Sequence, residues 1–551
     1  MSAKVPCMTH FSVEYILALA LMVAGVSVAA RRLRFASPLL MLVVGAVLAF
    51  VPGMPAVVLD PDVVLLALLP PLLYWSGVGM SWRGFRSNLR PILLLAVGCV
   101  LFTATAVAAA AHYALGLPWS VGFVLGAIVS PPDAVAPMAV LRRIGLPRRL
   151  VTVLEGESLV NDATALVAFS FALGAVQTGV FPLAAAMTRF VVVVVGEIGF
   201  GIAVGWLLLR LRHFSNEPRA EVLLALATPF VAFWPPHALG GSGVVACVAA
   251  GLYVSWNGRR LIRPATRLQG YFIWNLVVWG IEALVFLLTG LQAHAVVQGL
   301  SGEGLTRALW AGALTSITVI VVRFIWVFPA TYLPRLLVPA LRGRDPIPDW
   351  RWPFLVSFAG LRGVVSLAAA LSIPMSIGNL GDRPFPDRDL VLLATFCVIA
   401  VTLIGLGTTL PFVVRRLGLE RAGADEGAQN KRDERAARLQ GIDAVLAAID
   451  GCDIRDAPAF ALEALRRRHS DRRAHLAITA DEGTPDDPVA TASALELRLV
   501  DVERASIARA YAENRLTDEA RRRIERELDL EEARIRHALA SASAADPGAS
   551  D

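Results

Sequence analysis

Residues 156–162 read GESLVND, inside a stretch from Val151 to Val176 that is otherwise almost entirely apolar. An ionisable side chain at the centre of a bilayer costs about 2.5–3.5 kcal/mol on insertion scales, so it needs a partner, a water-filled cavity or a function. Eight consecutive residues here contain five polar ones: Glu155, Glu157, Ser158, Asn161 and Asp162. That density favours a functional site over a hydrogen-bond network that only fixes helix packing.

On an α-helix four of these polar residues form two pairs. Ser158 and Asp162 are four positions apart and share one face, whereas Glu157 and Asn161 share a face rotated by about 100°. One face therefore presents a hydroxyl and a carboxylate, and the other presents a carboxylate and an amide. Oxygen ligands of this kind suit hard cations, and a carboxylate among them can also hold a proton.

The whole chain is apolar enough to be a membrane protein. Of its 551 residues, 56% are hydrophobic, and the mean hydropathy is +0.61. A bilayer core of about 30 Å needs roughly 20 apolar residues per helix, and such runs recur from about Phe11 to Leu417. They predict an all-α polytopic protein with about thirteen transmembrane helices, which begin near residues 11, 36, 62, 91, 119, 149, 182, 221, 239, 271, 305, 352 and 389.

The arginines between these segments predict the orientation, because cytoplasmic loops carry an excess of basic residues. Basic breaks alternate with breaks such as 53–62 and 233–240, which have few or no basic residues. With only Lys4 before the first segment and RRLR (31–34) after it, the N-terminus is expected outside and the C-terminus in the cytoplasm. We interpret the first segment as a retained helix, although the SVAA before Arg31 is also compatible with signal-peptide cleavage.

Charge and cysteine content narrow the possible partners. The net charge of +6 mostly reflects the basic loops and the tail, so it predicts contact with anionic membrane lipid and not with nucleic acid. No CxxC spacing occurs among the five cysteines, so they predict neither a metal cluster nor a disulfide framework; they are Cys7, Cys99, Cys247, Cys397 and Cys452.

The composition changes abruptly to charged and alanine-rich near Glu420. We therefore expect a transmembrane domain over 1–419 and a helical cytoplasmic tail over 420–551. Apolar residues recur at helical spacing in the tail, for example Leu495, Leu499 and Val502. A polar helical tail of this kind is usually a solvated or dimerising extension, and we favour that interpretation over a regulatory role.

A second polar stretch, AIVSPPDAVAP (127–137), predicts a helix that is interrupted at mid-membrane. Pro131, Pro132 and Pro137 each lack an N–H donor and cannot all lie in an unbroken helix. Irregular backbone at this depth is tolerated only where it faces protein or a cavity. The freed carbonyls and Asp133 are therefore expected to face one site, as in transporters with discontinuous helices.

The stretch FAGLRGVVSL (358–367) places Arg362 between glycines inside an apolar segment. A lone intramembrane arginine is nearly always paired, and the candidate partners are Glu157, Asp162, Asp133 and Glu282. These four acids outnumber the one arginine, so a net negative charge would remain inside the membrane segments. A net negative charge suits a site that receives cations. Glu14, Glu197 and Arg323 are interpreted as snorkelling residues near segment ends or alone.

Two other classes of protein are compatible with single features. GGSG (240–243) matches the pattern around the serine of an intramembrane protease, but His294 lies near a segment end and small residues in membrane helices mostly serve close packing. A passive channel is the other alternative. The acids of 155–162 and a paired arginine suit a site that opens to one side at a time better.

Taken together, the motifs resemble the monovalent cation/proton antiporter family, which includes bacterial NhaP-type antiporters and animal sodium/proton exchangers. The resemblance covers about 400 residues in family order and implies an inverted-repeat fold with discontinuous helices. It also implies a homodimer in which a core domain moves past a dimerisation domain. The motifs are LLPPLLYWSG (68–77), SPPDAVAP (130–137), EGESLVNDATALV (155–167), HALGGSGVVACVAAGLY (237–253), IEALVFLLTGL (281–291) and FAGLRGVVSLAAALSIP (358–374).

The resemblance implies the roles of the ion-binding residues. Asp162 would bind H⁺ and Na⁺ alternately, and Ser158 and Asp133 would contribute to the Na⁺ site directly or through water. Asn161 before Asp162 resembles the Asn-Asp pair of the electroneutral branch. No cofactor is expected, and Na⁺ and H⁺ are the transported ions.

Other residues receive supporting roles from the same resemblance. Glu157 and Arg362 would form a structural ion pair, and Glu282 matches a glutamate of the family's ETxxFxFLG-like stretch. Glu155 is a second accessory candidate.

Two departures from the family pattern weaken the prediction of ion selectivity. Pro132 stands where many members have a ligand threonine, and Trp75 and Ser76 stand where some have an acid. The expected function is exchange of Na⁺ or Li⁺ for H⁺ in the bacterial inner membrane, by a transporter and not an enzyme. K⁺/H⁺ exchange on the same scaffold is the alternative.

Overall fold

The computed structural model describes residues 13–33, 36–52, 63–179, 183–215, 217–293, 303–339, 343, 345–377, 383–451, 458–478, 488–513 and 515–543. Several features of the sequence lie outside these residues: Lys4, Cys7, His294, Cys452 and the break 53–62. The described chain divides into two compact units, Met1–Gly423 and Ala424–Asp551. These units are defined by packing alone. The functional domains expected over 1–419 and 420–551 stay a prediction.

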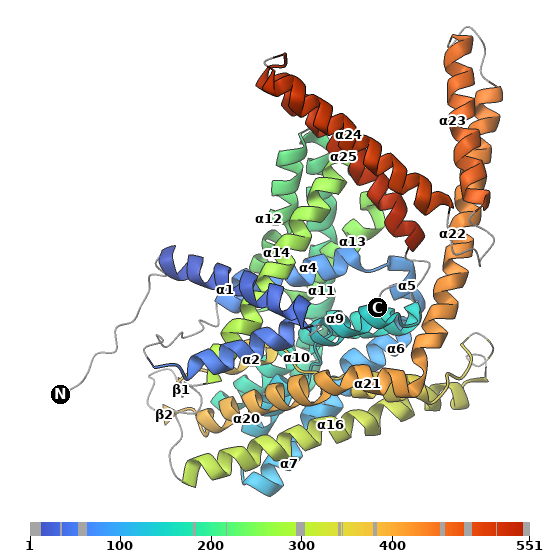
Figure 1. Ribbon diagram of the computed structural model, residues 1–551. Helices are drawn as coiled ribbons and strands as arrows, with labels where there is room; N and C mark the ends of the chain where they lie inside the picture. The colour runs from blue at the N-terminus through green and yellow to red at the C-terminus, as the bar shows by residue number, and fades with distance from the viewer. Residues whose placement is uncertain are drawn as a thin grey trace. The chain divides into compact units, whose positions relative to one another are not determined.

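Unit 1 is built of helices, with one short two-stranded sheet (Figure 1). Its N-terminal half contains α1 (Val13–Arg32), α2 (Ser37–Ala49), η1 (Val64–Leu68), α4 (Leu69–Gly79), α5 (Trp82–Ser87), α6 (Leu89–Leu93), η2 (Leu94–Cys99), α7 (Val100–Leu115), α8 (Trp119–Val129), α9 (Val135–Ile144) and α10 (Arg148–Thr178). The segments η1 and η2 are π-helical. Prolines begin several helices, as expected from their fixed φ and missing N–H.

The rest of unit 1 continues the helical pattern. It contains α11 (Leu183–Ser215), α12 (Pro218–Ala238), α13 (Val244–Leu261), α14 (Pro264–Leu291), α16 (Glu303–Leu337), α18 (Arg351–Phe358), α19 (Val364–Leu371), β1 (Ser376–Ile377), β2 (Arg383–Pro384), α20 (Arg388–Ala400), the π-helical η3 (Val401–Leu406) and α21 (Gly407–Leu417). The strands pair antiparallel, with Ser376 opposite Pro384. Figure 1 shows α16 beside the long helix formed by α20, η3 and α21.

Six helical stretches of the described chain are long and apolar enough to cross a membrane. Four shorter apolar helices accompany them: Ser37–Ala49, Val64–Gly79, Trp119–Val129 and Val244–Gly258. The prediction of a helical membrane protein is therefore supported, whereas the number thirteen stays a prediction. The six stretches are Leu89–Leu115, Arg148–Thr178, Phe190–Ser215, Thr266–Ala293, Thr306–Leu337 and Arg388–Leu417.

Glycines allow the helices of unit 1 to pack closely. The backbone of Gly126 on α8 lies directly against Ala104 on α7, and a side-chain carbon added there would collide with the Ala104 carbonyl. Gly77 on α4 and Gly251 on α13 approach each other in the same way. Small residues at such contacts are typical of membrane helices, where van der Waals packing drives helix association.

Unit 2 consists of α22 from Ala424 onward (the whole helix is Leu419–Asp450), α23 (Ala459–Ile478), α24 (Pro488–Ala512) and α25 (Asp518–Ser543). α24 and α25 form a hairpin (Figure 1) around Val500, Leu528 and Ile535. Leu495, Leu499 and Val502 of α24 remain exposed.

Candidate functional site

Two broken helices meet at the candidate site. α8 ends before Ser130 and α9 begins at Val135, because Pro131 and Pro132 interrupt the helix as the sequence predicts. A second break, not predicted from the sequence, separates α18 from α19 over residues 359–363. The breaks contact each other directly, since the Asp133 N–H donates to the Leu361 carbonyl over 2.7 Å.

Asp133 lies half-buried at the point where the two breaks meet. Its Oδ1 accepts a hydrogen bond from the Val135 N–H at 2.9 Å, so its carboxylate satisfies one of the free N–H groups at the start of α9. Gly363 packs so closely against this carboxylate that a side-chain carbon at 363 would collide with Oδ2. The position of Asp133 therefore depends on a glycine in the other broken helix.

The unbroken helix α10 passes the first break and contributes two polar side chains that bond to it. The Ser158 hydroxyl oxygen accepts from the Ala134 N–H at 3.1 Å, and Asn161 Nδ2 donates to the Pro132 carbonyl at 2.6 Å. The fully buried Asn161 Oδ1 has no hydrogen-bond partner among the described residues. The sequence-predicted residues Asp133, Ser158 and Asn161 thus lie around one interruption of the backbone.

Asp162 is one turn beyond Ser158 on the same face of α10 and is only 8% exposed. Within the described part of the chain, no hydrogen bond from a protein group reaches its carboxylate. A buried carboxylate without donors is unfavourable as a bare anion, so it is stabilised by binding either a proton or a cation.

The predicted ion pair between Glu157 and Arg362 is wrong. Glu157 pairs instead with Arg323 from the middle of α16, with Arg323 Nη1 at 2.6 Å from Oε1 and Nη2 at 2.9 Å from Oε2. Both side chains are only 2% exposed, so the snorkelling interpretation of Arg323 is also wrong. The bidentate geometry suits a planar guanidinium facing a carboxylate.

The sequence contained a signal for this pairing. Arg323 lies near the centre of the apolar stretch Thr306–Leu337, far from both of its ends. At that depth an arginine needs a partner as much as Arg362 does. The central position of Arg323 in this span is therefore the feature of the sequence that indicates a buried partner.

Arg362 bonds to the backbone of the first break and forms no ion pair with an acid among the described residues. Its Nη1 donates to the Ser130 carbonyl at the C-terminal end of α8, where the helix dipole is negative. Its backbone N–H donates to Thr402 Oγ1 in η3 at 3.0 Å. The Nε and Nη2 groups are buried without a hydrogen-bond partner in the described residues. The positive charge therefore faces the C-terminal end of α8.

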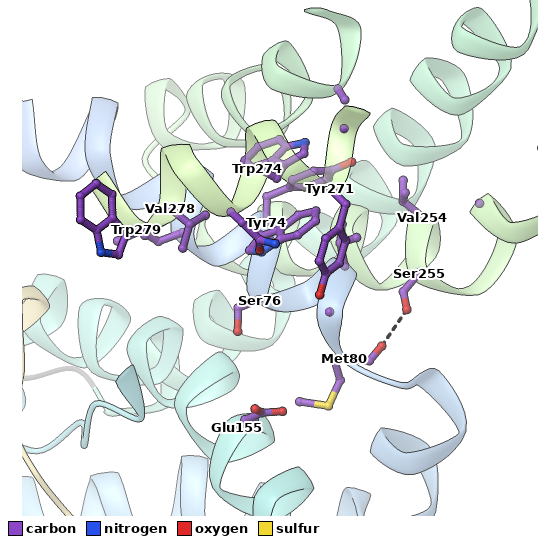
Figure 2. A pocket seen from close by; sticks show the side chains of 18 of the residues that line it. Tyr74, Ser76, Met80, Glu155, Val254, Ser255, Tyr271, Trp274, Val278 and Trp279 are labelled. Atoms are coloured by element: carbon purple, nitrogen blue, oxygen red, sulfur yellow. Dashed lines mark hydrogen bonds between the residues drawn. The ribbon is translucent and has the colours of Figure 1, made fainter. Parts of the chain in front are cut away.

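A cavity of about 810 Å³ leads to this site. Ala134 and Ser158 line it together with the two accessory candidates, Glu155 and Glu282. Figure 2 shows Glu155 of α10 on one side of the cavity and Tyr271 and Trp274 of α14 on the other. Glu155, Ser158 and Asp162 lie at i, i+3 and i+7, so one face of α10 runs from the cavity towards the buried carboxylate.

Aromatic side chains form much of the opposite wall. Trp75 stacks on Trp274 with ring centroids 5.4 Å apart and contacts the edge of Tyr271. Trp75 is one of the two residues that stand where some members of the similar family have an acid. The acids that line this cavity within the described residues are Glu155 and Glu282.

The serine of the GGSG stretch has a structural role. Glu197 of α11 accepts hydrogen bonds from the backbone N–H groups of Ser242, Gly243 and Val245 at 2.6, 3.0 and 3.2 Å, and Ser242 Oγ also donates to it. Glu197 is 4% exposed, so the snorkelling interpretation is wrong here as well. It satisfies the free N–H groups at the start of α13, and Ser242 is bonded to a carboxylate and not to a histidine.

Comparison with known proteins identifies the family of this chain. The profile of the family described as "Sodium/hydrogen exchanger, transmembrane" matches residues 17–416. An uncharacterised Na(+)/H(+) exchanger of Mycobacterium tuberculosis is 34% identical over 95% of this chain and 96% of its own. The "Sodium, potassium, lithium and rubidium/H(+) antiporter" of Bacillus pumilus is 30% identical over 68% of this chain and 57% of its own.

The fold is similar to a solved structure as well. The sodium proton antiporter MjNhaP1 of Methanocaldococcus jannaschii superposes with a TM-score of 0.58 at 19% identity, covering 73% of this chain and 98% of that one. The profile match and the 34% identity over nearly the whole length are sufficient to assign the family. This chain belongs to the transmembrane sodium/hydrogen exchangers, which are transporters and not enzymes.

Proposed function

We propose that this protein exchanges Na⁺ or Li⁺ for H⁺ by alternating access, with Asp162 as the residue that carries either ion. The observation that supports this most strongly is the buried Asp162 carboxylate, which lies one helical turn beyond Ser158, the residue that both contacts the first break and lines the cavity. A cation would be held by Asp162, the Ser158 hydroxyl and Asp133, with Asn161 Oδ1 as an oxygen available nearby. Such a set of hard oxygen ligands suits Na⁺.

Coupling follows from competition at one carboxylate. Asp162 can be neutralised by a proton or by a metal cation, but a bound proton removes the charge that attracts the cation. We do not assign this role to Glu157, because it is already paired with Arg323. One proton exchanged for one monovalent cation is electroneutral, and this is the stoichiometry we propose.

The broken helices supply a means of alternation. At the two breaks the backbone is not held by continuous helical hydrogen bonds, and the contact between Asp133 and Leu361 joins them. Movement of this crossing relative to the cavity wall formed by α4 and α14 would close the cavity on one side and expose the site on the other. The carboxylates Glu155 and Glu282 would attract cations into the cavity.

Asp162→Asn provides the direct test in proteoliposomes. The variant is expected to lose Na⁺/H⁺ exchange, measured as Na⁺-dependent dissipation of a pH gradient, while its melting temperature stays near that of the wild type. Asp389→Asn is the matched control, because Asp389 is exposed and far from the breaks in sequence. Wild-type exchange in Asp162→Asn would overturn the assignment.

K⁺/H⁺ exchange on the same scaffold is the second candidate. The Bacillus pumilus relative carries potassium in its name, and Pro132 offers no hydroxyl to a small cation. Exchange rates with Na⁺, Li⁺ and K⁺ measured side by side in the same vesicles would decide between the candidates. A K⁺ rate above the Na⁺ rate would replace the Na⁺ proposal without affecting the role of Asp162.

We also propose a homodimer in the bacterial inner membrane, with the N-terminus outside and the C-terminal tail in the cytoplasm. The distribution of arginines supports the orientation, and the similar exchangers of Mycobacterium tuberculosis and Bacillus pumilus, which are bacterial proteins, support the bacterial membrane. A protease-accessibility assay on sealed right-side-out vesicles tests the tail. Cleavage of the tail from outside would contradict this orientation.

A further inference from the structure

Three arginines converge on one aspartate at the ends of membrane-spanning helices. Arg149 Nη2 lies 2.7 Å from Asp345 Oδ1, Arg335 Nη2 lies 2.8 Å from Oδ2, and Arg90 also pairs with Oδ2. The arginines come from α6, α10 and α16, and Asp345 comes from the segment before α18. We call Arg90, Arg149 and Arg335 the arginine cluster.

The arginine cluster carries more positive charge than its partner can neutralise. Three guanidinium groups face one carboxylate, and no second acid pairs with them in the described part of the chain. Arg149 is additionally held by the neutral Asn88 through a hydrogen bond of 3.1 Å. Two positive charges therefore remain at a place where the side chains repel one another.

The cluster borders a small cavity whose remaining walls are mainly apolar. The cavity has a volume of about 70 Å³, and Leu94, Val327 and Val356 are among the residues that line it. Arg335 lines it too, is only 4% exposed, and has a buried Nε–H without an acceptor among the described residues. A buried donor without an acceptor is unfavourable, so this N–H is available to an anionic group that enters the cavity.

We infer that the arginine cluster binds the phosphate of an anionic phospholipid, whose acyl chain lies along the neighbouring apolar surface. Guanidinium groups recognise phosphate through paired hydrogen bonds. The apolar wall and the exposed Leu89 and Leu93 on α6 favour a lipid over a free phosphate ion. The cluster also lies at helix ends, where lipid headgroups are found. This inference does not depend on the transported ion.

The test measures lipid binding to the purified full-length protein. Its melting temperature is recorded in neutral detergent with added phosphatidylglycerol, phosphatidylcholine or inorganic phosphate. Phosphatidylglycerol is expected to raise the melting temperature of the wild type, and the other two are not. A shift produced equally by inorganic phosphate, or equally by phosphatidylcholine, would overturn the inference.

Variants locate the site. Arg149→Gln should weaken phosphatidylglycerol binding about fivefold, which is ~1 kcal/mol for one basic residue. Arg86→Gln is the matched control, because it removes one exposed arginine from the neighbouring α5 without touching the cluster. Asp345→Asn should strengthen the response, since it removes the anion that competes with the phosphate.

If Arg149→Gln does not fold, Arg90→Gln replaces it, because among the described residues the Arg90 side chain bonds to Asp345 alone, whereas Arg149 also holds Asn88. Equal phosphatidylglycerol responses in the cluster variant and in Arg86→Gln would refute the proposed site. None of these measurements depends on transport, so they remain informative even if Asp162 proves not to carry ions.

Discussion

The pair Glu157–Arg323 shows how strongly a single buried contact constrains this protein. Both partners are almost fully buried, and removing one leaves the other charge without compensation. Arg323→Met is therefore expected to destabilise the protein by about 3–5 kcal/mol. Removing both charges in Glu157→Gln/Arg323→Met should restore part of that loss, since no uncompensated charge remains.

Thermal unfolding of the purified variants measures both effects. Arg307→Met on the same helix serves as the control, because the Arg307 side chain is 53% exposed and its Nη1 lies 3.6 Å from Asp387 Oδ1. Exposed ion pairs of this kind contribute at most about 1 kcal/mol to the free energy of unfolding. A double variant whose destabilisation equals the sum of the two single ones would contradict the description of a coupled ion pair.

At the scale of elements, the crossing of the two broken helices decides where Asp133 lies. Gly363 leaves no space for a larger residue beside the Asp133 carboxylate. Gly363→Ala is expected to displace Asp133, to reduce ion exchange strongly and to cost about 1–3 kcal/mol of stability, as overpacking does. Proteoliposome exchange and the melting temperature are the two measurements.

Gly174→Ala on α10 is the matched substitution. No atom lies within 4 Å of a side-chain carbon at Gly174, and alanine is favoured over glycine inside a helix. This variant should retain exchange and melt at or above the wild-type temperature. Wild-type exchange in Gly363→Ala would show that the close approach of the breaks does not position the site.

At the scale of the whole transmembrane unit, Asp345 joins segments that are far apart in the chain. Partial burial raises the pKa of this carboxyl, but hydrogen bonds and charges from Arg149 and Arg335 lower it more, so the pKa lies below its usual value. A carboxyl whose pKa is lower in the folded protein than in the unfolded chain stabilises the folded protein at pH values above its pKa in the unfolded chain, which is near 4. This stabilisation is lost as the pH falls through the pKa of the carboxyl in the folded protein.

Asp345→Asn is accordingly expected to melt below the wild type near pH 7, and the difference should shrink below about pH 4. Melting temperatures of both proteins between about pH 3 and pH 7 provide the comparison, with the exposed Asp389→Asn as control. A difference that stays constant over this range would show that the charge of Asp345 does not act through the arginines.

Two local features of the candidate site follow from neighbouring residues in the sequence. The break at Pro131 and Pro132 follows from missing N–H donors, and the polar face of α10 follows from the helical period. The break at 359–363 contains no proline, and its glycines, Gly360 and Gly363, lower helix propensity without fixing where a helix ends, so the sequence did not predict it. The helix there is interrupted where the other broken helix crosses it.

By itself, the sequence determined that this is a helical membrane protein with polar groups gathered on one helix face, because hydropathy and helical spacing are properties of the chain alone. Only the tertiary structure decided that Glu157 pairs with Arg323, that Glu197 caps α13 and that Asp345 joins three arginines. The partners Glu157 and Arg323 are 166 positions apart. Which of two arginines reaches a buried carboxylate therefore depends on how the helices pack, and no spacing rule along one chain contains that information.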